Sequence, residues 1–353
     1  MPRENKDQHT SVLGLLRDEK LRLSIRKSKN MDSREAEELL VRIKLQYAER
    51  RHRRTLRRRW ISAAAVAIVV LVGGAGLYLT RLNTPLPLAS MASLLPGSPD
   101  VQLIVGTQRY LFARNTDFSI SGNTIIARSA QQSKTIEMDP RLAMNRVYAP
   151  RGRKSNLVLA DGTTVNLNSE SSFTFPSSFP DSRRDVSLDG EAFFKVAKNA
   201  AKPFTVSTAS FNVQVTGTQF NVNAYTADKV KTVVLAEGGV RITSKDLRRT
   251  VNMKPDELLT MQAGEWSISH VSAQDYTCWK DGYMLLQDMT LSEVLHHLSR
   301  HYGTSISCSS KIERLKCSGK LMLFDNEEGT VASLATIFNL KYTKKQGKII
   351  IYM

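Results

Sequence analysis

The chain has 353 residues, a net charge of +17 and a composition that is 41% hydrophobic, 7% aromatic and 24% charged. This length suggests two or three domains and is sufficient for substantial hydrophobic cores. The sequence contains no phosphate-binding loop, no Gly-x-Ser-x-Gly and no His-Glu-x-x-His, which argues against three common classes of enzyme.

The positive charge is concentrated at the start of the chain. Residues 1–59 contain 18 Lys and Arg against 9 Asp and Glu, a net charge of +9. Seven of the ten residues Arg50–Arg59 are arginine. A basic tail can attract nucleic acid, but arginines directly before an apolar run are typical of the cytoplasmic side of a membrane span. We therefore expect membrane contact and no direct nucleic acid binding.

The apolar run Trp60–Leu79 contains no charged residue. Twenty helical residues rise about 30 Å, the thickness of a bilayer's hydrocarbon core. A signal peptide would have a shorter leader and a shorter apolar run, and a buried soluble helix would usually show a polar face. The pattern predicts a single-pass inner-membrane protein with a cytoplasmic N-terminus, a transmembrane helix over 60–79 and a periplasmic C-terminus.

The tail carries one amphipathic pattern. Asp32 and Glu35 have the spacing of a capping box. The apolar stripe that follows, ending in Leu39, Leu40, Ile43 and Tyr47, indicates a helix that contacts a partner protein or the membrane surface. The alternative is a marginal helix that frays in isolation.

Residues 80–100 are rich in proline and read as a linker. From 101 to 270 the period is that of β-strands. Leu157 and Leu159 alternate before a three-residue loop, which places Leu157 opposite Val165 and requires a left-handed Gly162. Val186 and Leu188 alternate before a predicted turn at Asp189-Gly190.

Further along, apolar residues change parity. Phe211, Val213 and Val215 are odd-numbered, whereas Phe220, Val222 and Ala224 are even-numbered. Because a one-residue slip would turn every side chain to the other face, we expect a bulge or sharp bend at Gly217.

Residues 276–353 have a mixed pattern. Leu285-Leu286 predicts a strand, and a helix starting at Thr290, with Glu293 three residues on, should end near Gly303. Ile306, Leu321 and Leu323 fit strands, a second helix covers Val331–Phe338, and Gln346-Gly347 closes a hairpin. The order β-α-β-β-α-β-β predicts a small α+β domain.

Five motifs now occur in order over residues 147–242. They are P-x-G-x, L-x-L-x-DGT-x-V-x-LN, V-x-L-x-GEA-x-F-x-V, PF-x-V and GT-x-F-x-V. Together they resemble the periplasmic domain of FecR-like anti-sigma factors. The segment 276–353 resembles the domain that follows FecR domains in Bacteroidota proteins, which is similar to the secretin and TonB short N-terminal domain. The fold class is then membrane-anchored and mainly β: a single transmembrane helix, an all-β FecR-like periplasmic domain over 101–270 and a small α+β domain over 276–353.

The resemblance implies signal transduction. Such proteins hold an ECF sigma factor in the cytoplasm through the N-terminal segment, and they sense the N-terminal signalling domain of a TonB-dependent receptor in the periplasm. It implies a regulator of transcription and not an enzyme, without a cofactor. The alternative is a membrane-tethered, β-rich periplasmic module that binds glycan or envelope polymer.

Some FecR-like proteins cleave themselves at a Gly-Thr pair, and the matching residues are Gly217 and Thr218. A β-bulge glycine is the alternative reading of this pair. Glu191 reads as an exposed or hydrogen-bonded strand residue because no second carboxylate has partner spacing. His297 and His301 have i, i+4 spacing beside His296, but the pattern supplies no further metal ligand.

Three cysteines, Cys278, Cys308 and Cys317, lie on the predicted exported side, where disulfides are permitted. Cys308 and Cys317 flank a short connection and could pair, which would leave Cys278 free. Three free thiols are the alternative.

Overall fold

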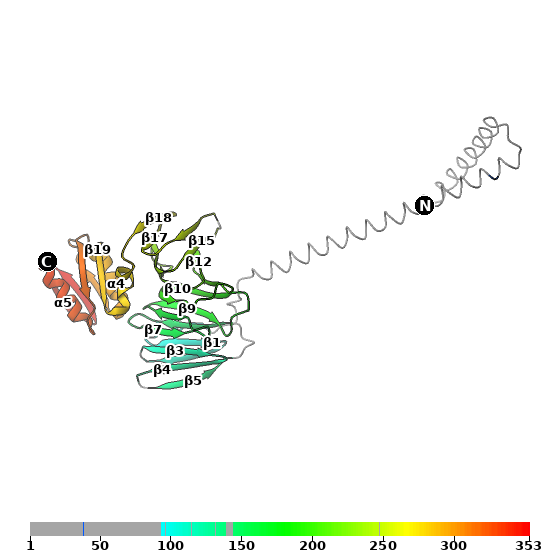
Figure 1. Ribbon diagram of the computed structural model, residues 1–353. Coiled ribbons are helices and arrows are strands. Elements are labelled where there is room, and N and C mark those ends of the chain that lie inside the picture. Colours follow the sequence, from blue (N-terminus) through cyan, green and yellow to red (C-terminus); the bar gives the residue numbers. More distant parts are fainter. Residues whose placement is uncertain are drawn as a thin grey trace, which may run out of the picture. The chain divides into compact units, whose positions relative to one another are not determined.

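The computed structural model describes residues 93–353, apart from Pro96, Arg114, Gln131, 139–143 and Leu247, together with Glu38 (Figure 1). The described residues from Ser93 onward belong to one compact unit, 86–353. The predicted tail and the span over 60–79 lie outside the described residues. Within the described part, no helix is both long and apolar enough to cross a membrane.

Residues 101–270 are built from β-strands that form two series of hydrogen-bonded neighbours. The first series runs β2 (Gln108–Phe112), β1 (Val101–Val105), β6 (Met144–Ala149), β9 (Ser171–Pro176), β10 (Arg184–Lys195), β11 (Phe204–Ser207), β12 (Phe211–Val215), β15 (Val240–Ser244) and β16 (Thr250–Met253). The second runs β5 (Ser133–Glu137), β4 (Thr124–Ser129), β3 (Thr116–Ser121), β7 (Ser155–Val158), β8 (Thr164–Leu167), β10, β13 (Gln219–Ala224), β14 (Val230–Glu237), β17 (Glu257–Gln262) and β18 (Glu265–His270). Strand β10 joins the two series.

Strand β10 runs straight through the predicted turn at Asp189-Gly190, so that prediction is wrong. Its first half pairs with β9 and β11, and its second half, from Gly190, pairs with β8 and β13. The parity of the sequence explains this, because every even-numbered residue from Val186 to Phe194 is buried, and the odd-numbered residues are not, apart from Phe193. Gly190 has φ +122° and passes Ser171 so closely that a Cβ would lie 2.6 Å from the Ser171 Cα. Gly190 therefore lies where β10 passes from the first series of strands to the second, and it does not form a turn.

The bend predicted at Gly217 is confirmed. Strand β12 belongs to the first series and β13 to the second, and the pairing of β13 with β14 shifts register between Gln219 and Phe220. The predicted hairpin is confirmed as well: Leu157 pairs with Val165, and Gly162 has φ +82°.

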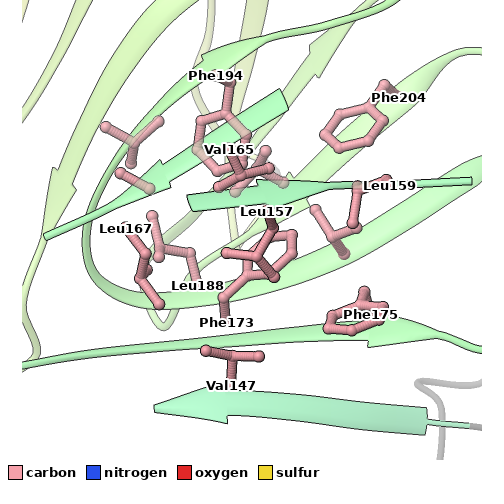
Figure 2. Packing of buried hydrophobic residues seen from close by; sticks show 14 of the residues in the cluster. Val147, Leu157, Leu159, Val165, Leu167, Phe173, Phe175, Leu188, Phe194 and Phe204 are labelled. Carbon is pink, nitrogen blue, oxygen red and sulfur yellow. The ribbon is translucent and has the colours of Figure 1, made fainter. Parts of the chain in front are cut away.

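The inward-facing side chains of both series form one hydrophobic cluster. Figure 2 shows Leu157 and Val165 of the second series above Phe173 and Val147 of the first. All four are at most 1% exposed. Burial of side chains of this size stabilises the fold by about 1.5–3 kcal/mol each before the loss of chain entropy. The prediction of a mainly β fold is confirmed.

The α+β pattern at the C-terminal end is confirmed in the order predicted. After α3 (Ala273–Thr277) and the 3₁₀ helix η2 (Cys278–Asp281), the elements are β19 (Tyr283–Thr290), α4 (Leu291–Tyr302), β20 (Ser305–Cys308), β21 (Lys316–Met322), α5 (Glu327–Ile337), β22 (Lys341–Lys345) and β23 (Lys348–Tyr352). Leu323 lies just beyond β21. The Thr290–Glu293 capping box begins α4, and a left-handed Gly303 ends it.

The C-terminal elements bury a second hydrophobic cluster of their own, centred on Leu291, Leu295 and Leu298 of α4 and Ile349 and Ile351 of β23. Strands β20, β23 and β22 form one small sheet, and β19 and β21 form another. Residues 101–270 and 283–353 are called below the β domain and the C-terminal domain.

Candidate functional site

The Gly217-Thr218 pair sits at a corner where only glycine fits. Gly217 has φ +155°, and a Cβ there would lie 2.5 Å from the Lys198 Cγ and 2.8 Å from its Cα. The Thr218 side chain is buried, and its Oγ1 donates a hydrogen bond of 2.9 Å to the Gly239 carbonyl. The Thr218 carbonyl in turn accepts from the Val196 N–H at 3.0 Å. The corner thus has a clear structural role, and self-cleavage at this bond stays a prediction.

The DGT motif forms a buried ionic corner. Asp161 accepts hydrogen bonds from the Thr163 amide at 3.0 Å and the Thr163 hydroxyl at 2.8 Å. It also accepts from the Arg184 Nη1 at 2.6 Å, and the Arg184 side chain is only 1% exposed. Arg184 donates further to the carbonyls of Ala197 and Lys202. Asp161 therefore stabilises its turn, as predicted, and also neutralises a buried guanidinium.

The β domain and the C-terminal domain meet at the end of helix α4. Arg300 is 5% exposed and donates to both carboxylate oxygens of Asp228, at 2.9 and 3.0 Å, and to the Glu170 Oε2 at 2.9 Å. Its guanidinium lies 3.6 Å from the centroid of the Tyr225 ring. We call these four residues the Arg300 cluster. A planar guanidinium is suited to both interactions, because it can bind a carboxylate through two parallel hydrogen bonds and stack on an aromatic ring.

Electrostatics in the Arg300 cluster favour the charged forms. Burial alone would raise the pKa of Asp228 and Glu170. Hydrogen bonds from Arg300 at Asp228, and from Arg151 and then Arg300 at Glu170, outweigh this effect and lower both pKa values. The cluster is thus an ionic contact at neutral pH.

Backbone contact accompanies the cluster. The Gly152 N–H donates to the Arg300 carbonyl at 3.0 Å. A Cβ on Gly152 would lie 2.7 Å from the Tyr302 carbonyl oxygen, and one on Gly303 would lie 3.0 Å from the Arg151 carbonyl oxygen. The two glycines let a loop of the β domain and the end of α4 touch.

A second polar group lies along the same junction. Glu191 accepts from the Asn168 and Asn221 side-chain amides at 2.8 and 2.9 Å, and Asn221 accepts from the Trp279 indole at 3.3 Å. Burial raises the pKa of Glu191, and these amide hydrogen bonds offset it in part. The Lys154 ammonium donates to the Trp279 carbonyl at 2.9 Å, and burial lowers the pKa of Lys154 to about 8. Glu191 is the hydrogen-bonded strand residue that the sequence predicted.

Between these groups lies a cavity of about 620 Å³. Its walls include Glu191 and Asn221 from the β domain, Trp279 from η2, and His297 and Arg300 from α4. Burial lowers the pKa of His297 and of His301 to about 4. In the part of the chain that the structure describes, no three His, Cys, Asp or Glu side chains are placed to hold a metal ion.

The three cysteines are free, so the pairing of Cys308 with Cys317 is not formed. Cys308 ends β20 in one small sheet, and Cys317 lies on β21 in the other. Cys278 is 2% exposed and lies on the wall of the cavity. Burial raises the pKa of all three thiols, which lowers the fraction of reactive thiolate at neutral pH.

The C-terminal domain also presents an open sheet edge. Strand β22 is one of the two edge strands of its three-stranded sheet and reads Lys-Tyr-Thr-Lys-Lys, with Tyr342 37% exposed. Exposed apolar side chains occur elsewhere on this domain, among them Met322, Phe324 and Ile337. An edge strand of this kind can accept a strand from a partner.

Comparison with known proteins assigns both domains. The model of the FecR protein family matches residues 145–241, and that of the FecR C-terminal domain matches residues 283–352. This chain is a FecR-like protein. No curated protein sequence matches it.

Solved structures agree with the FecR-like assignment. Two crystal structures of a "putative anti-sigma factor" from Parabacteroides distasonis ATCC 8503, at 2.50 and 1.65 Å resolution, are 27% identical to this FecR-like chain. Each match covers 59% of this chain and 98% of the other, with TM-scores of 0.55 and 0.54. The family and these structures support an anti-sigma, regulatory role.

The predicted sigma-contact residues Leu39, Leu40, Ile43 and Tyr47 lie outside the described residues. Sequence reasoning identified Asp161, Glu191, Gly217 and Thr218 but missed the Arg300 cluster. No local pattern marks Arg300 as buried, because it falls two residues after Leu298 on the helix, at a position that the C-terminal domain's own core does not need. A buried arginine there requires an acidic partner from another part of the chain.

Proposed function

We propose that this FecR-like protein relays the state of a TonB-dependent outer-membrane receptor, across the inner membrane, to an ECF sigma factor in the cytoplasm. The observation that carries the proposal is the combination on one chain of a FecR domain and a FecR C-terminal domain after a predicted span with a basic N-terminal flank. Such a chain has parts in both compartments that the signal must connect.

On the cytoplasmic side, residues 1–59 would contact the sigma factor through Leu39, Leu40, Ile43 and Tyr47. Apolar side chains at three-to-four-residue spacing suit helix-in-groove recognition. On the periplasmic side, the receptor's N-terminal signalling domain would dock on the C-terminal domain. The open edge of β22, with its three lysines, suits strand addition by a partner whose edge is acidic.

The cytoplasmic half is tested by co-purification. Residues 1–59, tagged, should retain a co-expressed ECF sigma factor from the same organism, whereas a variant with Leu39→Asp and Ile43→Asp should not. The matched control, Glu38→Gln, changes an exposed residue next to the stripe and should bind as the wild type does. Absence of binding, together with unchanged regulon transcription after gene deletion, would exclude the sigma-factor partner.

The periplasmic half is tested separately. Replacing Lys341, Lys344 and Lys345 by Glu should abolish binding of the receptor's signalling domain to the full-length protein, because the edge would then repel an acidic strand. Lys320→Glu, on β21, is the control. Equal binding by both variants would exclude β22 as the docking edge.

A further inference from the structure

We propose that the C-terminal domain is clasped onto the β domain by the Arg300 cluster and that this clasp can open while both domains stay folded. The clasp defines a closed form of the exported part of the chain. The inference follows from the packing of the junction and does not depend on the partners proposed above.

The first argument is that the two domains do not share a core. The hydrophobic cluster of the β domain and that of the C-terminal domain have no residue in common. Each domain can therefore keep its own buried apolar surface when the two separate. Interfaces between domains of one chain that lack a common core permit relative motion by default.

The second argument is the chemistry of the junction. Its central contacts are charged or polar: Arg300 of α4 binds Asp228 and Glu170, and Trp279 of η2, the segment that connects the two domains, binds Lys154 and Asn221 of the β domain. A cavity of about 620 Å³ separates the surfaces beside them. Water can replace hydrogen bonds of this kind on opening, whereas it cannot replace apolar packing.

The third argument is that one residue concentrates the contact. Arg300 makes three hydrogen bonds to two loops of the β domain and stacks on Tyr225. Glu170 lies between β8 and β9, and Asp228 lies between β13 and β14. Removing one partner of a buried ion pair leaves the other charge uncompensated, so loss of Arg300 acts on the junction far more than loss of a surface ion pair.

The test uses Cys278 as a native reporter. Cys278 is 2% exposed on the wall of the junction cavity, and Cys317 is 0% exposed inside the C-terminal core. Full-length protein is treated with iodoacetamide at a fixed pH, and alkylation of each cysteine is followed by mass spectrometry. Because the labelling of a buried thiol requires opening, the two rates separate release of the clasp from unfolding of the domain.

In Arg300→Ala, Cys278 should react at least about tenfold faster than in the wild type, with Cys317 unchanged, because Asp228 loses its bidentate partner and no guanidinium then ties α4 to the two loops. Asp228→Asn should show a smaller increase in the same direction. The matched control, Lys344→Ala, removes the exposed pairs with Glu327 and Glu328 in the same domain and should leave Cys278 unchanged.

Two results would overturn the clasp. Unchanged Cys278 labelling in both Arg300→Ala and Asp228→Asn would mean that the cluster does not hold the domains together. If instead Cys317 reacted as fast as Cys278 in both variants, the cluster would be part of the fold and not a releasable contact.

Discussion

At the scale of single residues, the motifs of this chain are explained mainly by the fold. Asp161 was predicted to stabilise a turn, and the structure shows that it also binds the guanidinium of Arg184, 23 positions away. The turn could be predicted because its residues are adjacent. The ion pair could not, because nothing local to Arg184 in the sequence distinguishes it from Arg183 beside it, which is only partly buried.

Replacement of Asp161 by Ala should lower the free energy of unfolding by about 3–5 kcal/mol, because it leaves the buried Arg184 charge without a partner. Urea unfolding of the full-length protein measures the change. Lys198→Ala removes an exposed pair with Glu237, 4.0 Å long, and should change stability by less than about 1 kcal/mol. A similar loss in both variants would contradict the role assigned to Asp161.

The histidines of α4 should make the C-terminal domain sensitive to acid. His297 has a pKa of about 4 in the folded protein, against 6.5 ordinarily. Between pH 6.5 and pH 4 the unfolded chain therefore binds a proton at His297 that the folded chain does not bind. Stability should therefore fall as pH drops from about 6.5 to 4, by about 1–3 kcal/mol for this side chain.

The comparison variant is His297→Gln, which should flatten the dependence of Tm on pH between 7 and 4.5. His270→Gln, on the exposed strand β18, should keep the wild-type slope. Parallel Tm profiles for the wild type and His297→Gln would show that His297 protonates as easily in the fold as in the unfolded chain.

At the scale of elements, the glycines of the β domain mark where the chain passes from one series of strands to the other. The passage at Gly217 could be predicted from the sequence, because the buried residues change from odd-numbered to even-numbered there. At Gly190 the parity is continuous, and an Asp-Gly pair that resembles a turn lies inside a twelve-residue strand. Pairing between distant strands decides such cases, and a local pattern does not contain it.

Gly190→Ala should therefore destabilise the β domain strongly, by more than about 2 kcal/mol, because the new Cβ would overlap the Ser171 backbone and φ is +122°. Gly239→Ala, at a position with open space around the Cβ, serves as the control and should be close to neutral. Chemical denaturation of each variant gives the comparison. Equal stability of Gly190→Ala and the wild type would mean that β9 and β10 can separate without loss.

At the scale of the whole molecule, the β class of residues 101–270, several of their strands and the order of elements in 283–353 could be predicted from periodicity, caps and turn residues. How the two domains contact each other could not, because their junction is made of Arg300, Asp228 and Glu170, residue types that a sequence pattern assigns to the surface. The loops that carry Glu170 and Asp228 become neighbours only after the β domain has folded.

Because the two cores are separate, damage to one should remain local. Leu298→Ala, in the C-terminal core, should cost that domain about 2–5 kcal/mol. Amide hydrogen exchange should then increase across 283–353 and stay unchanged in β10 to β13. Leu111→Ala, at a 44% exposed position on β2, should alter neither region, and increased exchange in β10 to β13 of Leu298→Ala would show a shared core.

The contact between Gly152 and Gly303 has a consequence for the comparison of relatives. Each glycine excludes a side chain because the other segment's backbone occupies the space. A relative with a larger residue at the place of Gly152 has to move these two segments apart, and one with a larger residue at the place of Gly303 has to adopt a strained backbone and displace the Arg151 carbonyl slightly. Glycine at both Gly152 and Gly303, about 150 positions apart in the sequence, thus distinguishes relatives whose C-terminal domain can contact the β domain in this way from those in which it cannot.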